Sequence, residues 1–358
     1  MRTIAAWQMV AAGELRRVSL PLPVLAAGEV LVEVHGCGVC HTDLSYFYDG
    51  VPTLQKPPLT LGHEISGIVV AAAESDSPLL GRAVIVPAVL PCHVCEICRM
   101  GRPNRCLQQK MPGNSLGIYG GFASHIPVPG RDLCRVPEVP GGGLTLAHLA
   151  VVADAVTTPY QAAQRAAVTT GDRVVVIGAG GGVGGYMTQM AKALGAAVVV
   201  GIDLHAGRLA ALQDYGLDHA IPAAGMSPPQ IRAAFKEISA SHHRSRQMGW
   251  KIFECSGSQA GQALAMELLS FVGKLVVVGY GRHTLPFNLS RLMAFDAEII
   301  GSWGCAPAAY PTVLQMCLDG RIALMPFVDL QPMRHIHEVF ADAHAGKLMR
   351  RVVLTPDF

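Results

Sequence analysis

The stretch DRVVVIGAGGGVGG at residues 172–185 decides the fold of the second half of the chain. A short apolar run, a glycine-rich turn and the following GYMTQMAKALG predict a buried strand, a tight turn and a helix. In that context the glycines let the backbone approach a pyrophosphate closely, and the helix N-terminus offers free N–H groups. The stretch therefore predicts a dinucleotide site. Its candidate residues are Gly178, Gly180, Gly181, Gly182, Val183 and Gly184, with the register either Gly180-x-Gly182-x-x-Gly185 or a core at 181–184.

The acidic residue after the next strand bears on the choice of cofactor. Asp203 ends the run VVVGID, at the position where a carboxylate accepts hydrogen bonds from ribose hydroxyls and repels a 2′-phosphate. We therefore expect NAD rather than NADP. Arg208 weakens this preference slightly, because an arginine soon after the strand can reach a phosphate. Asp203 can also cap the following helix, and the two roles can coexist.

Two different sequence patterns divide the chain into two expected domains. From 154 to 301 strands alternate with helical patterns, for example in HAGRLAALQDYGL at 205–217, which predicts a parallel sheet covered on both faces. Residues 1 to about 135 carry short apolar runs between Gly and Pro, which is typical of a barrel-like, largely antiparallel domain. The tail after about 302, with two helical stretches and the strand RRVVLTP, is expected to return to the first domain. The expected domains are thus 1–153 with 302–358, and 154–301.

Composition excludes several classes of protein. About half of the 358 residues are hydrophobic, 15% are charged and the net charge is +2, so no strong field points to nucleic acid or a membrane surface. Apolar stretches are too short for a transmembrane helix, and MRTIAAWQMV lacks a signal-peptide core. Six of ten cysteines lie in or beside metal-binding patterns, and the others are expected in the core. Reduced thiolates without an export signal lead us to expect a cytoplasmic protein.

Four cysteines form the sharpest local motif, C-x2-C-x2-C-x7-C. Cys92, Cys95, Cys98 and Cys106 suit one tetrahedral zinc ion, and a site closed by four thiolates is structural. Ferredoxin cysteine runs begin in the same way, but they close with x3-C-P. Four unrelated buried cysteines would be unusual in a loop rich in Arg, Pro and Gly. The zinc loop is expected at about 91–107.

A second metal pattern lies upstream of this loop. Catalytic zinc takes three protein ligands and keeps one open position. Cys40 and His63 supply two ligands, and either Glu64 or Asp154 can supply the third. Asp43 is either an acceptor that orients His63 or a local turn carboxylate.

Four motifs occur in an order that resembles that of the zinc-dependent medium-chain alcohol dehydrogenases. They are GVCHTD at 38–43, GHE-x2-G at 62–67, the cysteine run and GGVG. The resemblance covers nearly the whole chain. It implies a GroES-like β-barrel catalytic domain, a Rossmann NAD-binding domain, two zinc ions per chain and hydride transfer at the catalytic zinc. It also implies a homo-oligomer, a dimer or a tetramer.

The same resemblance assigns roles to single residues. It makes Cys40, His63 and Asp154 the catalytic ligands, although many relatives have cysteine at the last position, and Glu64 remains a further candidate. It implies that Thr42 takes the substrate proton and that His41 lies near the cofactor pyrophosphate. Ser45 stands where several relatives have a relay histidine, so the end of the proton path is open.

A narrower resemblance concerns the substrate. Four stretches of the sequence resemble those of dehydrogenases of the 6-hydroxycyclohex-1-ene-1-carbonyl-CoA type. They are DLSYFYDGVPT, KMPGNS, FECSGSQAGQ and LMAFDAEIIGSWGC. This implies oxidation of a secondary ring alcohol to a ketone on an acyl-CoA in anaerobic aromatic degradation. Tyr46, Phe47 and Trp303 would line a cyclic pocket or pack in the core. The basic stretch 241–249, with Arg244 and Arg246, would contact a CoA phosphate or form a surface loop.

Two alternatives remain open. One is a zinc alcohol or polyol dehydrogenase that acts on a small free alcohol. The other is a non-catalytic zinc- and nucleotide-binding regulatory protein. A complete catalytic-zinc set beside a separate four-thiolate site disfavours the latter, and the absence of a basic aromatic stripe disfavours nucleic acid as a partner.

Overall fold

The computed structural model describes residues 3–137, 143–242 and 248–358. The chain divides into two compact units, residues 1–157 with 304–358 and residues 158–303. The sequence placed these boundaries at 153/154 and 301/302. Each unit has its own hydrophobic core and is described by itself.

The unit of residues 158–303 is built on a parallel six-stranded sheet. Its strand order is β11-β10-β9-β12-β13-β14, the doubly wound order of dinucleotide-binding folds. The strands are β9 (Arg173–Ile177), β10 (Val198–Asp203), β11 (His219–Pro222), β12 (Trp250–Glu254), β13 (Lys274–Val277) and β14 (Glu298–Gly301). The helices are α3 (Thr157–Ala166), α4 (Gly184–Ala193), α5 (Ala206–Ala210), α6 (Pro228–His242), α7 (Gln259–Leu268) and α8 (Ser290–Phe295).

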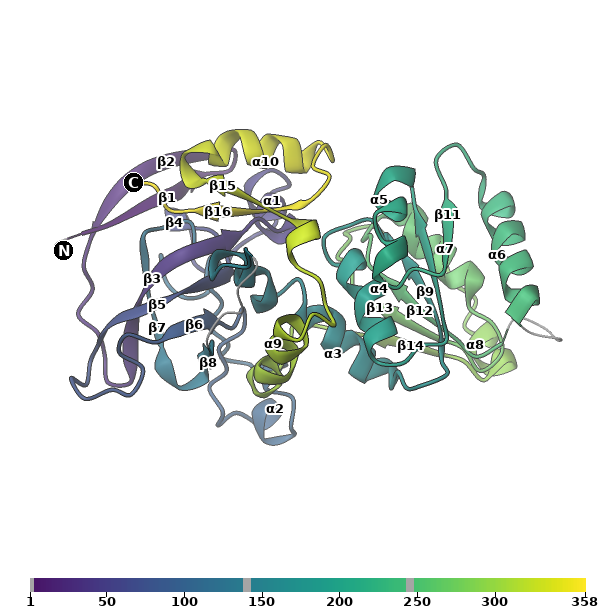
Figure 1. Cartoon of the computed structure of the whole chain (residues 1–358), viewed down its shortest axis with the longest axis horizontal. Helices are drawn as coiled ribbons and strands as arrows, with labels where there is room; N and C mark the ends of the chain where they lie inside the picture. Colours follow the sequence, from purple (N-terminus) through teal and green to yellow (C-terminus); the bar gives the residue numbers. More distant parts are fainter. Residues whose placement is uncertain (1–2, 138–142, 243–247) are drawn as a thin grey trace. The chain divides into compact units, whose positions relative to one another are not determined.

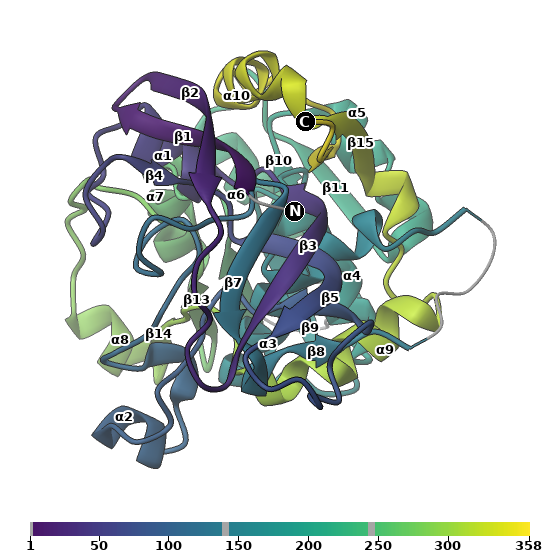
Figure 2. The same ribbon diagram turned by 90° about the vertical axis from the view of Figure 1, so that its left-hand side faces the viewer.

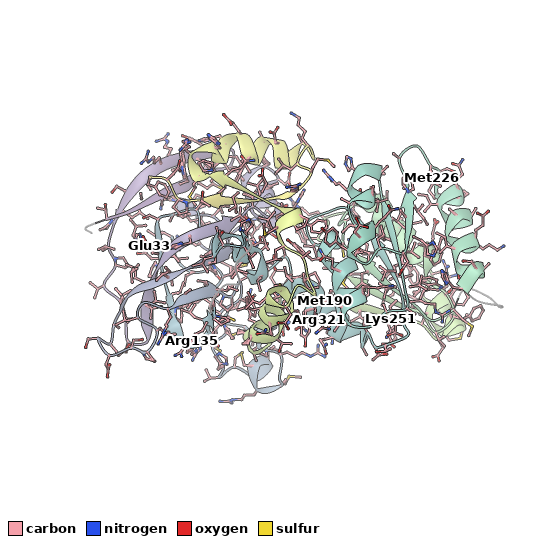
Figure 3. All side chains as sticks on the ribbon, in the orientation of Figure 1. Glu33, Arg135, Met190, Met226, Lys251 and Arg321 are labelled. Atoms are coloured by element: carbon pink, nitrogen blue, oxygen red, sulfur yellow. The ribbon has the colours of Figure 1, made fainter. Side chains whose placement is uncertain are left out.

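Helices cover both faces of this sheet, with α4 and α6 on opposite sides (Figure 1). The apolar runs of β9 and β10 are buried because neighbouring strands flank them and helices cover them. Met190, labelled in Figure 3, is fully buried on α4. The Rossmann fold expected from the sequence is confirmed.

One expected helix in this unit is shorter than predicted. The pattern at 205–217 predicts one continuous helix, but the structure has α5 and then a 3-10 turn at Gln213–Tyr215. Gly216 follows this turn with a φ of 101°, a left-handed conformation that favours glycine and ends the helical segment.

The other unit is mostly antiparallel β-structure. A three-stranded sheet has the order β2-β1-β4, and a seven-stranded sheet has the order β15-β16-β3-β5-β6-β8, with β7 paired to β3. The strands are β1 (Thr3–Ala11), β2 (Glu14–Pro21), β3 (Glu29–Gly38), β4 (Leu59–Thr60), β5 (Glu64–Ala72), β6 (Ala83–Val86), β7 (His125–Pro129), β8 (Cys134–Arg135), β15 (Val328–Pro332) and β16 (Arg351–Thr355).

The C-terminal segment completes this sheet, because β16 pairs antiparallel with β3 and parallel with β15. Helices and 3-10 segments flank the sheets: α1 (His41–Phe47), α2 (Glu96–Arg99), η1 (Pro103–Arg105), η2 (Gly130–Asp132), η3 (Ala147–Ala153), η5 (Pro307–Ala309), α9 (Tyr310–Leu318), η6 (Met325–Phe327), η7 (Met333–His335) and α10 (Ile336–His344). Figure 2 shows α10 beside the β1–β2 hairpin. Within the described residues, no helix combines the length and the apolar character needed to cross a membrane.

Candidate functional site

The four cysteines of the loop after β6 lie together. Two thiolates about 2.3 Å from one tetrahedral zinc ion would be about 3.8 Å apart. The Sγ atom of Cys95 lies 3.5 Å from that of Cys98 and 3.8 Å from that of Cys106. All four sulfur atoms lie within 4.8 Å of one another. The donor set and its spacing therefore fit one zinc ion.

Backbone amides of the loop prepare its sulfurs for the thiolate form. Cys106 Sγ accepts N–H groups from Cys92 and Gln108, both at 3.2 Å, and Cys92 Sγ accepts the N–H of Cys95 at 3.3 Å. The backbone N–H of Cys98 is the largest cause that lowers the pKa of Cys95, to about 6. Burial raises the pKa of Cys98 to about 12. Such unequal thiols become equivalent ligands when one cation neutralises all of them.

A second group of four potential ligands comes from three separate segments. Cys40 caps the N-terminus of α1, His63 immediately precedes β5, Glu64 begins β5, and Asp154 follows η3. One ligand atom from each residue lies within 4.8 Å of the others. The Nε2 atom of His63 is 3.5 Å from Asp154 Oδ2, and Cys40 Sγ is 3.9 Å from the same oxygen. Ligands around a tetrahedral zinc ion are about 3.3 to 3.6 Å apart, so a small contraction would complete a coordination shell.

Burial in this group is uneven. His63 and Glu64 are almost completely buried, whereas Asp154 exposes 19% of its side chain. Neither ring nitrogen of His63 has a hydrogen bond of good geometry, which is costly for a buried imidazole. A metal ion at Nε2 would remove that cost. The donor set of thiolate, imidazole and carboxylate fits zinc.

Asp43 organises two of these ligands. Its Oδ2 atom accepts the N–H of Cys40 at 3.1 Å, and its Oδ1 atom accepts the N–H of Gly62 at 3.0 Å. Oδ1 also lies 3.3 Å from Nδ1 of His63. Burial alone would lower the pKa of His63, but Asp43 and then Asp154 raise it well above its usual range. The surroundings therefore favour positive charge at His63, which suits a bound cation. This geometry favours the orienting role for Asp43 over the turn role.

Glu64 has a partner that the sequence analysis did not identify. Arg351, at the start of β16, donates from Nε to Glu64 Oε2 at 2.8 Å and from Nη2 to Oε1. Both side chains are buried. Burial raises the pKa of Glu64, with Arg351 opposing it, and Glu64 outweighs the effect of burial to raise the pKa of Arg351. Because both carboxylate oxygens bind Arg351, direct ligation of a metal by Glu64 would share or break this ion pair.

The predicted proton path begins beside Cys40. Thr42 Oγ1 lies 3.7 Å from Cys40 Sγ, and Ser45 is half-buried one helical turn later in α1. His41 is exposed on the same helix, and its role toward the cofactor remains a prediction.

The aromatic residues expected in a substrate pocket have other surroundings. Tyr46 accepts a hydrogen bond from Asn114 Nδ2 at 2.6 Å and lies in the hydrophobic core. Phe47 packs edge-on against Phe340 in the same core, with 5.5 Å between ring centroids. Both residues therefore follow the core alternative. Trp303 is 43% exposed in the other unit, and its pocket role remains a prediction. Arg244 and Arg246 lie outside the described residues.

In the other unit, the glycine-rich turn has the required close approaches. Gly178 has a φ of 76°, and a Cβ on Gly184 would lie 1.9 Å from the carbonyl oxygen of Gly178. Gly181, Gly182 and Val183 complete the turn, and α4 begins at Gly184. The free N–H groups of this helix start are the expected pyrophosphate site.

Asp203 is tied to this turn. Its Oδ2 atom accepts the N–H of Gly180 at 2.8 Å, and its Oδ1 atom accepts the N–H of His205 at 2.9 Å before α5. The role of Asp203 toward the ribose hydroxyls remains a prediction. Arg208 lies beside Gly180, since a Cβ on that glycine would be 2.8 Å from the Cβ of Arg208.

The two domains and the two metal-ligand sets define a class, the metal-dependent dehydrogenases with a Rossmann domain. Comparisons with known proteins specify it further. The sequence profile described as "Alcohol dehydrogenase GroES-like domain" matches residues 26–138, and that described as "Zinc-binding dehydrogenase" matches residues 182–319. An alcohol dehydrogenase from Geobacillus stearothermophilus is 30% identical over 335 residues, which is 93% of each chain. The chain therefore belongs to the zinc-dependent medium-chain alcohol dehydrogenases, a family of oxidoreductases.

Two other relatives illustrate the range of this family. Sorbitol dehydrogenase from Rattus norvegicus is 27% identical and covers 93% of this chain and 91% of its own. The structure of acetophenone reductase from Geotrichum candidum in complex with NAD superposes with a TM-score of 0.83 at 25% identity, covering 99% of this chain and 98% of its own. The GroES-like and Rossmann architecture is thus shared along the whole chain.

Proposed function

We propose that this protein is a zinc- and NAD-dependent dehydrogenase that oxidises a hydroxyl group of a small free alcohol or polyol. The observation that carries the proposal is the group of Cys40, His63, Glu64 and Asp154, whose ligand atoms converge within 4.8 Å. When bound there, zinc lowers the pKa of a coordinated hydroxyl, much as it lowers that of water to about 7. We place that hydroxyl on the Asp154 side of the group, because this side chain is 19% exposed.

The chain's own residues then handle the proton and the cofactor. Thr42, beside Cys40, accepts the proton of the substrate hydroxyl, and Ser45 continues the path toward solvent. The glycine turn and the N-terminus of α4 bind the pyrophosphate, and Asp203 accepts hydrogen bonds from the ribose. His41 contributes to pyrophosphate binding. The carboxylate of Asp203 favours NAD over NADP, and Arg208 lies close enough to weaken that preference.

Two observations support a free alcohol over an acyl-CoA. Relatives named for alcohol and sorbitol oxidation align with over nine-tenths of the chain. Tyr46 and Phe47, which would have lined a cyclic pocket, lie in the core. The acyl-CoA alternative rests on the four sequence stretches quoted above and on a basic segment outside the described residues. Acetophenone reductase, named for an aryl ketone, keeps secondary alcohols with an aromatic substituent among the candidates.

The testing experiment follows NADH absorbance with purified protein, NAD⁺ and three substrates: sorbitol, cyclohexanol and a cyclic β-hydroxyacyl-CoA. We expect turnover with a free alcohol. Turnover with the thioester alone would replace the substrate part of the proposal with the acyl-CoA alternative. Absence of turnover with any substrate and either nicotinamide cofactor would favour the regulatory alternative.

A pair of thiol variants separates the metal centre from general stability. Cys40→Ser should abolish turnover because it removes a thiolate ligand. Cys134→Ser is the matched control, since Cys134 is buried on β8 of the same unit and belongs to neither group of ligands. Equal loss in both variants would contradict the proposed role of Cys40.

We also propose a homo-oligomer, as in the family, and a cytoplasmic location. Light scattering of the purified protein should give the mass of a dimer or a tetramer of 37.8 kDa chains.

A further inference from the structure

A buried tyrosine joins two of the segments that bring the metal ligands together. Tyr310 is the first residue of α9 and is 1% exposed. Its hydroxyl donates to the carbonyl of Ala153 at 2.5 Å and accepts the N–H of Ala88 at 3.2 Å. Ala153 precedes Asp154, and Ala88 follows β6. One phenol oxygen therefore connects the segment that ends in Asp154 with the sheet.

The sheet side of this connection leads to His63. Strand β6 pairs with β5 through Ile65 and Val86, and His63 immediately precedes β5. Ala88 lies two residues after Val86, and His63 lies two residues before Ile65. The strand pairing therefore connects Ala88 to the imidazole of His63 over a short path. The phenol oxygen is thus linked along both segments to the two ligand atoms that lie 3.5 Å apart, His63 Nε2 and Asp154 Oδ2.

The Asp154 segment needs an external hydrogen-bond donor. Ala153 ends the 3-10 helix η3, and the last carbonyls of a helix have no partner within the helix. This residue is fully buried, so water cannot replace the missing donor. The buried Thr157 hydroxyl provides a weaker contact at 3.5 Å to the carbonyl of Asp154 itself. Tyr310 is therefore the main anchor of this helix end.

We propose that Tyr310 is a positioning residue, which fixes Asp154 relative to His63 so that both can bind one metal ion. The inference deepens the proposed function and rests on it, because it takes Asp154 as a ligand. Tyr310 touches neither the metal nor the substrate. It acts through the peptide group between Ala153 and Asp154.

The test compares Tyr310→Phe with Ser66→Ala. Ser66 donates to the carbonyl of Leu146 at 2.6 Å, at the other end of the same 3-10 helix. Each variant removes one buried hydroxyl-to-carbonyl hydrogen bond from η3, but only Tyr310 anchors the end next to Asp154. Purified zinc-loaded proteins are treated with a chromogenic chelator, and Asp154→Ala identifies the phase of zinc release that belongs to this centre.

We expect Tyr310→Phe to weaken zinc binding in that phase about ten- to a hundred-fold, the usual effect of losing a residue that supports a ligand. The visible absorption bands of the cobalt-substituted protein should shift in Tyr310→Phe and stay unchanged in Ser66→Ala. NAD⁺ binding, followed by calorimetry, should be equal in all proteins. Equal zinc affinity in the two variants would overturn the inference and reduce Tyr310 to a structural role.

Three further outcomes test the inference and keep it separate from the proposed function. If Tyr310→Phe does not fold, Thr157→Val takes its place, and unchanged zinc release in that variant would count against positioning of Asp154 by its buried neighbours. If wild type oxidises no alcohol while Tyr310→Phe still loses zinc, the proposed function fails and the positioning role stands. If Asp154→Ala releases zinc as wild type does, Asp154 is not a ligand and the inference is overturned.

Discussion

The two groups of metal ligands in this chain are assembled in opposite ways. The four-cysteine group comes from one loop, and the amide groups of that loop bind its sulfurs. The Cys40 group comes from three segments and is supported by buried charges, those of Asp43 and Arg351. A local group depends on a short piece of chain, whereas an assembled group depends on the whole unit. The assembled group can therefore combine an open side with precise positioning.

The largest effect is expected when the assembled group loses Asp154. Asp154→Ala should lower kcat/KM on the order of a thousand-fold, because activation of a substrate by a metal contributes several kcal/mol. NAD⁺ affinity should be unchanged, since the glycine turn belongs to the other unit. Steady-state kinetics and calorimetry measure the two quantities.

The local group supplies the control. Cys98→Ser should remove one of two zinc ions per chain and expose residues 91–107 to proteolysis, while the remaining protein keeps most of its turnover. A Cys98→Ser protein as inactive as Asp154→Ala would contradict the division into a structural and a catalytic site.

The next largest effect concerns the buried ion pair. Arg351→Met leaves the carboxylate of Glu64 buried without its partner, which should lower the free energy of unfolding by about 3 kcal/mol. The double variant with Glu64→Gln should recover part of that loss. Urea unfolding measures both, and a loss below about 1 kcal/mol would mean that water reaches the pair.

A smaller effect is expected from replacing Asp43, which orients metal ligands but is not itself a ligand. Asp43→Asn should weaken metal binding at the assembled site about ten- to a hundred-fold. The matched variant is Asp132→Asn, because Asp132 contacts His93 of the cysteine loop at 2.8 Å, where the histidine is exposed. We expect less than about a two-fold change there, and equal effects at both sites would remove the contrast between them.

The smallest effect is expected where an ion pair is only partly buried. Lys251, labelled in Figure 3, lies 2.5 Å from Asp172 in the unit of residues 158–303. Burial would raise the pKa of Asp172, but Lys251 and the N–H of Thr169 lower it. Its stabilising contribution is therefore present above the usual carboxyl pKa of about 4 and is lost as pH falls through the lower folded-state value.

Asp172→Asn should accordingly cost about 0.5 to 1 kcal/mol at pH 7 and progressively less as pH falls below the usual carboxyl pKa of about 4. Thermal unfolding across this pH range checks the prediction. A cost that stays constant down to the acid limit would assign the effect to the lost hydrogen bonds rather than to the charge.

The sequence predicted what is local. The run 172–185 identified β9, the turn and α4, and the cysteine spacing identified a site within one loop. Helix α6 also carried a usable signal, because Ile231 and Phe235 are spaced i, i+4 after two prolines at its start. The β1–β2 hairpin is harder to predict, because β1 alternates apolar residues with alanines and half-exposed side chains, and β2, described over its whole length, buries only Leu15.

The partners of the assembled site could not be predicted from local patterns. Arg351 lies 287 residues from Glu64, and Tyr310 lies 157 residues from Ala153. Nothing in RRVVLTP distinguishes an arginine that enters the core from one that faces water. Topology decides this, because β3 pairs with β16 on one edge and with β5 on the other, so that Arg351 reaches Glu64 across β3.

The distance along the chain between Glu64 and Arg351 also sets an order of events during synthesis. The ribosome adds about 5 to 20 residues per second, so the 287 residues between the two partners take on the order of half a minute to translate. A nascent chain that has exposed residue 106 already carries every cysteine of the local site. The assembled site has to wait for the last strand. During synthesis, the four-cysteine site can therefore bind zinc before the assembled site has all of its supporting residues.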